Sequence, residues 1–156
     1  MQPCYSGPVS LVNALMIAGE RGIAVARKSG AALPGFETTV GVRVETPQGR
    51  TSVVGALVGS GHGRVIGIDD FQVDVVPEGW LLVIRNRDVP GVIGRVGTVL
   101  GGAHINIGSY HQARRSGPGD GALAAITVDQ ALTNGVLDEL QKMPDILQVR
   151  LVSFDT

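Results

Sequence analysis

The chain has 156 residues, 44% of them hydrophobic, and a formal net charge of −1. This length fits one ordinary domain or two small ones, and the near-neutral charge excludes the basic stripe of a nucleic-acid binder. One cysteine, Cys4, excludes an internal disulfide and is too little, with three histidines, for a zinc or iron–sulfur site. No apolar run has the roughly 20 residues of a membrane span, and no secretory signal is visible. We therefore expect a cytoplasmic protein without a nucleic-acid or membrane partner.

The first half of the chain predicts one helix followed by β-hairpins. Apolar residues at helical spacing indicate a helix over residues 8–20, and a short strand is expected at 23–26. Glycine and proline make residues 27–36 a loop. From 38 to 76 the apolar residues alternate with a period of two, with turn signals between them, which predicts two consecutive hairpins.

The second half predicts a βαββαβ unit. Pro77 and Gly79 interrupt the hairpin pattern, so we expect one domain over residues 1–77 and another over 79–156. The βαββαβ order is that of the ferredoxin-like fold, in which the helices cover one face of the sheet and something else must cover the other. The six elements are expected at residues 80–85, 91–100, 105–111, 123–128, 136–143 and 146–154. The fold class is therefore α+β.

The polar turn at residues 85–94, RNRDVPGVIG, is the main candidate for a binding site. It leads from a strand into a helix N-terminus, where unpaired N–H groups and a partial positive charge hold carboxylates and phosphates. A ligand with an amine and a carboxylate could pair its ammonium with Asp88 and its carboxylate with these N–H groups. Asn106, at the start of the next strand, is expected to come close to Asp88. The same spacing also fits a structural role, in which Asp88 and Asn106 cap and brace the turn.

The run at 85–107, RNRDVPGVIGRVGTVLGGAHINI, resembles the opening of an ACT domain, the amino-acid-sensing module. It is most similar to the ACT domain at the C-terminus of D-3-phosphoglycerate dehydrogenase, the first enzyme of serine synthesis. The family pattern is a polar residue, a spacer, Asp or Asn, then x-Pro-Gly, a helix and an aliphatic-Asn-Ile strand. In this chain the pattern is met by Asn86, Asp88, Pro90, Gly91 and residues 105–107.

This resemblance implies a serine site where two ACT domains meet edge to edge, and hence a homo-oligomer. It implies that Asn86, Asp88 and Asn106 surround the ligand, with Asp88 on the amine and the two asparagines on the carboxylate or hydroxyl. The family often has His or Tyr where Asn86 stands, so Asn86 departs from the usual pattern.

The upstream half is similar to the anion-sensing, allosteric substrate-binding domain of the longer dehydrogenases of this family. The resemblance is carried by residues 12–14, 20–23 and 67–71. That domain usually begins with a strand and a helix that do not precede Met1, so we expect a truncated α+β domain, and one usual turn glycine is here Asp70. Arg64, beside a glycine-rich run, is the candidate contact for an anionic effector. A solvated arginine at a hairpin end fits the same pattern.

Catalytic motifs are not visible in the sequence. The fingerprint G-x-G-x-x-G does not occur after a strand, and no histidine stands out with a carboxylate partner. We therefore expect the serine-binding regulatory region of an NAD-dependent D-3-phosphoglycerate dehydrogenase, without catalytic residues, metal or cofactor of its own. NAD would bind in domains absent from this chain.

Two alternatives stay open. The chain could be a free-standing ACT module that oligomerises or senses a ligand. It could also be the regulatory half of a serine dehydratase-like enzyme, whose iron–sulfur cluster would need several cysteines from another region.

Overall fold

The computed structural model describes residues 7–30, 33–47, 49–59, 61–115 and 121–154. The chain divides into two compact units, residues 1–31 and 32–156. Among the described residues, no helix combines the length and apolar character needed to cross a membrane.

The first unit contains a short helix, α1 (Ala14–Glu20), with Asn13 at its N-cap. The helix predicted over 8–20 is therefore shorter at its start, where the Asn13 side chain accepts a hydrogen bond from the backbone N–H of Ser10 at 2.7 Å. The strand predicted at 23–26 is wrong. A strand needs a neighbour to pair its backbone groups, and this segment has no such partner in the described chain, so Ile23 and Val25 stay exposed.

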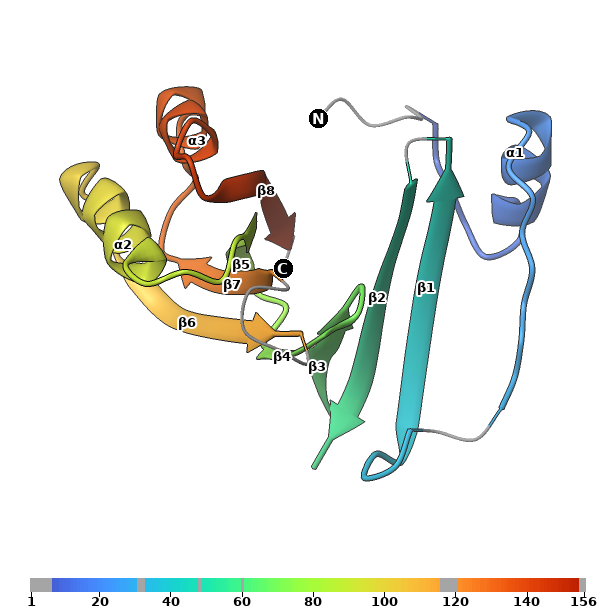
Figure 1. Cartoon of the computed structure of the whole chain (residues 1–156). Coiled ribbons are helices and arrows are strands. Elements are labelled where there is room, and N and C mark those ends of the chain that lie inside the picture. The colour runs from blue at the N-terminus through green and yellow to red at the C-terminus, as the bar shows by residue number, and fades with distance from the viewer. Residues whose placement is uncertain (1–6, 31–32, 48, 60, 116–120, 155–156) are drawn as a thin grey trace. The chain divides into compact units, whose positions relative to one another are not determined.

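The second unit begins with a four-stranded antiparallel sheet in the order β1-β2-β3-β4 (Figure 1). Its strands are β1 (Thr38–Thr46), β2 (Gly49–Val58), β3 (His62–Ile68) and β4 (Phe71–Val75). The two predicted hairpins are confirmed, and β2 also pairs with β3. Asp69 turns the chain between β3 and β4 with a φ of 51°, and its Oδ1 accepts a hydrogen bond from the Ser52 N–H at 2.9 Å.

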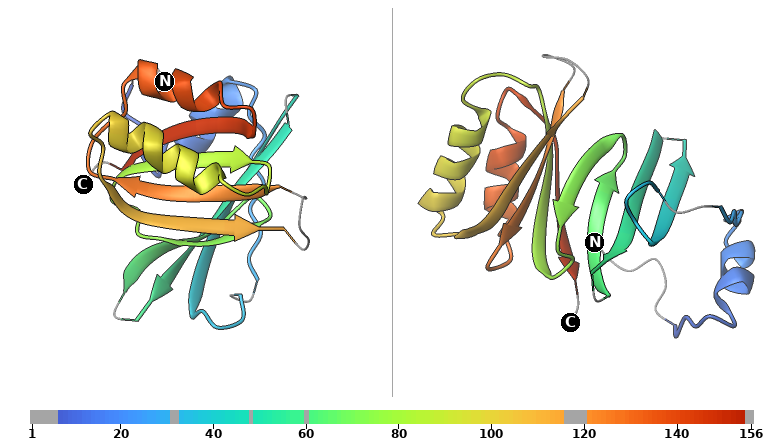
Figure 2. Two further views of the ribbon diagram at one scale, coloured as in Figure 1. Left: turned by 60° about the vertical axis from the view of Figure 1, so that its left-hand side comes forward. Right: turned by 90° about the horizontal axis from the view of Figure 1, so that it is seen from below.

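The predicted βαββαβ unit is confirmed as a four-stranded antiparallel sheet in the order β6-β7-β5-β8. Its elements are β5 (Gly79–Asn86), α2 (Val92–Gly102), β6 (Ile107–Arg114), β7 (Ala122–Val128), α3 (Asn134–Gln141) and β8 (Ile146–Phe154). Both helices lie on one face of this sheet (Figure 2). The first helix of this unit was predicted to end at residue 100, but α2 continues through Gly101 and Gly102, and its C-cap is Ala103.

The helix-covered face of this sheet holds the main core. Leu82 and Ile84 of β5 are fully buried against Val96 and Leu100 of α2 and Leu140 of α3. Burying one such aliphatic side chain stabilises the fold by about 1.5–3 kcal/mol. This core fixes where α2 lies on the sheet, and with it the position of the helix N-terminus.

The opposite face of the sheet is covered by strands of the upstream sheet. Phe71, Val73 and Val75 of β4 pack in one buried cluster with Leu81 and Leu123. The expected cover is therefore supplied by the upstream hairpins. The buried side chains of this cluster are apolar, so the contact between the two sheets contains a second hydrophobic core.

Candidate functional site

A pocket of about 440 Å³ opens at the N-terminal end of α2. Residues 89–94, which form the turn and the first helical turn, line one side of it. Asn86 and Asp88 reach it from the end of β5, and Gln112 and Arg114 reach it from the end of β6. Four polar side chains from two strands thus meet at one helix N-terminus.

The sheet register explains why residues so far apart in the sequence meet here. Asn86 of β5 pairs with Ala122 of β7, and Ala122 pairs with Arg114 of β6. Asn86 follows Leu82 and Ile84 at intervals of two, so its side chain points to the helix-covered face. Since only Ala122 of β7 stands between Asn86 and Arg114 in this row, the two side chains approach the same space.

The helix begins without a side-chain cap. Its N-cap residue, Gly91, has a φ of 86°, and a Cβ there would lie 3.0 Å from Nη1 of Arg95. Glycine is required at this position because the left-handed backbone strains other residues. The first helical hydrogen bond runs from the Arg95 N–H to the Gly91 carbonyl at 3.0 Å. The N–H groups of residues 92–94 precede it, lack helical acceptors and carry the partial positive charge of the helix start.

Two contacts with the α3–β8 connection hold this turn in place. Arg95 forms an ion pair with the carboxylate of Asp145. The backbone N–H of Arg87 donates to the Asp145 carbonyl at 2.8 Å. The pocket is therefore attached to the rigid part of the domain on the side of α3.

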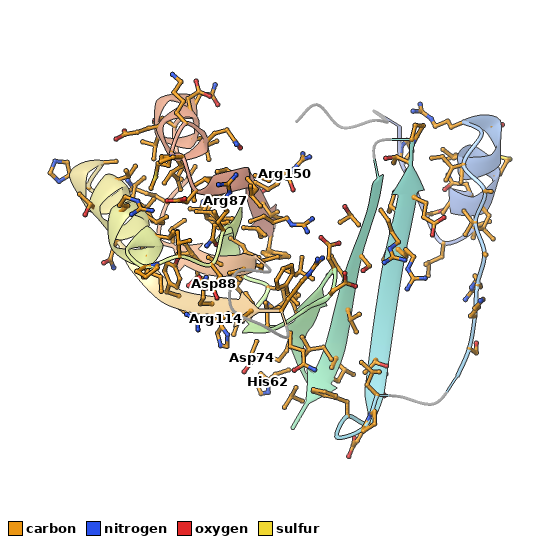
Figure 3. The ribbon with its side chains drawn as sticks, in the orientation of Figure 1. His62, Asp74, Arg87, Asp88, Arg114 and Arg150 are labelled. Atoms are coloured by element: carbon orange, nitrogen blue, oxygen red, sulfur yellow. The ribbon has the colours of Figure 1, made fainter. Side chains whose placement is uncertain are left out.

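Asp88 is the buried charge of the pocket. Its side chain is only 9% exposed, and its Oδ1 lies 3.2 Å from Nε of Arg114, whose side chain is 65% exposed. Figure 3 shows the two side chains close together near the start of α2. A buried carboxylate needs a charged or hydrogen-bonding partner, and Arg114 supplies one. The Arg114 side chain is mostly exposed to solvent. Its guanidinium can therefore move away from Asp88 and stay hydrated.

Two polar atoms of the pocket are buried without a hydrogen-bond partner among the described residues. They are Oδ1 of Asn86 and Oε1 of Gln112. Asn86 is 1% exposed, and its Nδ2 donates to the Arg87 carbonyl at 2.7 Å, so the oxygen is the part of the amide that lacks a partner among the described residues. A buried acceptor without a donor costs about 1–3 kcal/mol. A hydrogen-bond donor of a ligand that reached either oxygen would remove this cost.

A third unpartnered polar atom lies outside the pocket. The hydroxyl of Tyr110, on β6, is buried without a partner among the residues that the structure describes, and burial raises the pKa of this phenol. Tyr110 does not line the pocket and packs against the main core. Tyr110 therefore belongs to the core under the helices and not to the pocket lining.

Comparison with known families identifies both parts of the chain. The D-3-phosphoglycerate dehydrogenase intervening domain matches residues 1–69, and the ACT domain matches residues 80–145. Over most of its length the chain therefore resembles an intervening domain followed by an ACT domain, as in the regulatory region of D-3-phosphoglycerate dehydrogenases.

Curated relatives agree with this assignment. D-3-phosphoglycerate dehydrogenase of Synechocystis is 34% identical over 138 residues, which cover 88% of this chain and 25% of that protein. The Bacillus subtilis enzyme is 32% identical over 152 residues, covering 97% of this chain and 29% of the enzyme. The chain thus spans less than a third of these enzymes. The probable L-serine dehydratase beta chain of Bacillus subtilis is 29% identical over 141 residues, covering 90% of this chain and 64% of that protein.

Of the three residues assigned to the serine site, the ACT structure brings together two. Asn86 and Asp88 line the pocket, whereas Asn106 does not. Nδ2 of Asn106 donates to Oδ2 of Asp129 at 2.8 Å. Asn106 precedes β6, and the pocket lies where β6 ends at Arg114, about 26 Å further on at roughly 3.3 Å per residue. The expected closeness therefore fails within one chain, because β5 and β6 both run toward the pocket.

Arg64, the candidate anion contact of the intervening domain, is engaged by a carboxylate. Its Nε donates to Oδ1 of Asp74 at 2.6 Å. An anion would have to displace Asp74, so the effector site stays a prediction. Residue 60, within the adjacent glycine-rich run, lies outside the described residues. In the described ranges, His, Cys, Asp and Glu form no group of three or more that could hold a metal ion.

Gln112 and Arg114 are pocket residues that the sequence analysis missed. The strand was predicted to end at residue 111, but β6 continues to Arg114; residues 116–120, which follow it, lie outside the described residues. The signal that could have found both residues is the ferredoxin-like strand order. In this order β7 lies between β5 and β6, and the C-terminal ends of β5 and β6 lie at the same end of the sheet.

Proposed function

We propose that this region binds a small α-amino acid, foremost L-serine, in the pocket at the start of α2, and that binding regulates a catalytic unit. The observation that carries the proposal is a buried carboxylate, Asp88, beside the unpaired Oδ1 of Asn86 at a helix N-terminus. These oxygens are acceptors for an ammonium group and for a hydroxyl. The helix N–H groups are donors for a carboxylate.

The names of the relatives support serine as the ligand. The family resemblance implies a place in serine synthesis for the dehydrogenase relatives, and the dehydratase relative is named for L-serine itself. A region shared by an enzyme that leads to serine and one named for its dehydration is suited to sense the concentration of that amino acid.

A second copy of the chain would complete the site. β6 is an edge strand of its sheet, so its outer backbone groups can pair with another strand. In an antiparallel pairing of two β6 strands, the start of one strand lies opposite the end of the other. The partner's Asn106 would then approach the pocket near Arg114. Ligand binding at this seam would favour one arrangement of the paired domains and shift the population of active enzyme.

The catalytic step would belong to residues outside this chain. Those residues would bind NAD and oxidise 3-phosphoglycerate, and a coupling of 1–3 kcal/mol is typical of such regulation. The cytoplasmic location stays a prediction.

The match to the dehydratase chain favours one second candidate, the regulatory half of an L-serine dehydratase-like enzyme. The two candidates differ in the chemistry that serine controls. Addition of L-serine to the complete enzyme would change the reduction of NAD with 3-phosphoglycerate in the first case and the release of pyruvate from L-serine in the second.

Isothermal titration calorimetry with L-serine, glycine and L-alanine tests the proposal. We expect saturable heat with L-serine and none with Asp88→Ala, whose melting temperature should stay close to that of the original chain because Asp88 lies in a turn. Glu139→Ala, which removes an exposed carboxylate from α3, is the control and should bind as before. No heat with any of the three amino acids at millimolar concentration would refute the proposal. Unchanged binding by Asp88→Ala would place the site elsewhere.

A further inference from the structure

The pocket already contains an ion pair between Asp88 and Arg114. We propose that its ligand is bound as a zwitterion that inserts into this pair. Arg114 takes the carboxylate of the ligand, and Gln112 joins Asp88 in holding the ammonium. This inference rests on the proposed function and assigns roles to two residues of β6.

The acceptors of the pocket match an ammonium group in number and kind. An ammonium has three N–H donors. Three acceptor oxygens belong to residues of the lining: the carboxylate of Asp88, and Oδ1 of Asn86 and Oε1 of Gln112, which are buried without a hydrogen-bond partner among the described residues. The two amide oxygens have no partner among the described residues, so an ammonium between them and Asp88 would satisfy both.

Arg114 is placed to follow the other end of such a ligand. Its Nε lies 3.2 Å from Oδ1 of Asp88, and its side chain is 65% exposed. A guanidinium has five N–H donors and binds carboxylates through two parallel hydrogen bonds. When an ammonium replaces it at Asp88, Arg114 can therefore turn to the adjacent carboxylate of the same ligand.

The charge balance then selects among ligand classes. A zwitterion replaces one ion pair by two and leaves the buried Asp88 paired. A cation pairs Asp88 but offers nothing to Arg114. An anion draws Arg114 away and leaves Asp88 buried without a partner, which is the costly case. The expected order of affinity is zwitterion, then cation, then anion.

Arg115 provides a matched control on the same strand end. Its Nη2 lies 3.2 Å from Oδ2 of Asp70, in the turn between β3 and β4, and Arg115 does not line the pocket. Substitution of Arg114 or Arg115 by methionine removes the same charge and keeps a similar length. Only the change at position 114 should alter ligand binding.

Calorimetry with three ligands tests the role of Arg114: L-serine, L-serinamide, which lacks the carboxylate, and L-glycerate, which lacks the ammonium. The original chain should bind L-serine most tightly, L-serinamide more weakly and L-glycerate too weakly to measure. Arg114→Met should lose at least tenfold in affinity for L-serine and bind L-serinamide as well as before or better, because Asp88 is released. Arg115→Met should match the original chain with all three ligands.

Three outcomes would overturn the assignment of Arg114. Unchanged L-serine affinity in Arg114→Met, with binding by the original chain intact, refutes it and leaves the proposed function standing. An equal loss for L-serine and L-serinamide would show that Arg114 acts only on the shape of the pocket. If the original chain binds none of the three ligands, the proposed function fails, and the zwitterion site fails with it.

Gln112 is tested separately. Gln112→Leu removes the buried acceptor and keeps the volume, so the melting temperature should not fall. Its affinity for L-serine and for L-serinamide should fall about tenfold in both cases, since both ligands carry the ammonium. Unchanged affinity for both ligands would contradict the role of Gln112.

Discussion

On the helix-covered face of the ACT sheet, the last row of side chains includes Asn86 and Arg114, and Oδ1 of Asn86 has no partner in the described chain. On the opposite face, their sequence neighbours Arg85 and Arg115 are engaged with the upstream sheet. Arg85 lies 3.5 Å from Asp69, and both arginines stack over the ring of Phe71 at 5.9 and 5.3 Å.

This difference between the two faces shows how the same strand end can both line the pocket and contact the upstream sheet. Alternation along a strand sends consecutive side chains to opposite faces, so residues 85 and 86, or 114 and 115, separate without any change of backbone. Polar groups on the face opposite the helices are paired and hold the upstream sheet against the ACT sheet. Polar groups on the helix face are incompletely paired, which costs stability and leaves room for a ligand. The following variants break or sharpen this contrast, in order of decreasing effect.

Truncation of the two cores should cost similar amounts. Leu81 faces the upstream sheet and Leu82 faces the helices, and they are 2% and 0% exposed. We expect Leu81→Ala and Leu82→Ala each to lower the free energy of unfolding by about 2–5 kcal/mol in chemical denaturation. Val42→Ala, at a position 61% exposed on β1, should cost less than about 0.5 kcal/mol. If Leu81→Ala cost as little as Val42→Ala, the upstream sheet would not be the cover of this face.

The docked turn should depend on Asp69. Its side chain is 15% exposed, accepts from Ser52 and pairs with Arg85, and its φ is positive. Asp69→Ala should lower the free energy of unfolding by about 1–3 kcal/mol, since it leaves the Ser52 N–H unpaired and keeps a left-handed residue. Asp70→Ala removes a carboxylate that is 61% exposed and should cost less than about 1 kcal/mol. Equal costs would show that burial of the turn is unimportant.

The pocket face should behave in the opposite way when its buried acceptor is removed. Asn86→Leu replaces an amide whose oxygen has no partner in the described chain by an apolar group of similar size. We expect the free energy of unfolding to stay within about 1 kcal/mol of the original value or to rise, with L-serine binding lost. A loss above about 2 kcal/mol would mean that Asn86 braces the turn, as its spacing alone also allowed.

The smallest expected effects separate the wall of the pocket from the rest of α2. A Cβ at Gly94 or at Gly97 meets open space, but only Gly94 lines the pocket. Both Gly94→Ala and Gly97→Ala should raise the free energy of unfolding by about 0.5–1 kcal/mol, because alanine loses less backbone entropy in a helix. Only Gly94→Ala should also weaken L-serine binding. Equal affinities of the two variants would mean that the ligand does not reach the first turn.

Much of the fold could be predicted from the sequence because the patterns were local. The alternation in the hairpins and the helical stripe with Val92, Val96 and Leu100 led to the observed elements. The strand predicted at 23–26 was wrong because an apolar run forms a stable strand only when another strand pairs with it. The helix extends further than its sequence indicates. Burial of Leu100 of α2 in the core outweighs the weak helix propensity of Gly101 and Gly102.

The candidate site was predictable only where its residues were close in sequence. Asn86 and Asp88 flank one turn, so their meeting at the helix start followed from local structure. Gln112 and Arg114 reach the pocket through strand order and register, which a single sequence does not display. The spacing in the sequence placed Asn106 near Asp88, but spacing alone does not show in which direction α2 and β6 run. In the structure, α2 carries the chain away from the pocket before β6 returns to it.

The most direct test of the pocket is a titration with L-serine followed by nuclear magnetic resonance on the nitrogen-labelled chain. We expect saturable shifts in the side-chain amide signals of Asn86 and Gln112 and in the backbone amides of residues 92–94. The amides of Ser52 and Asp69, on the docked face, should stay nearly unchanged. Shifts confined to the surroundings of Arg64, or no shifts at saturating L-serine, would contradict an amino-acid site at the start of α2.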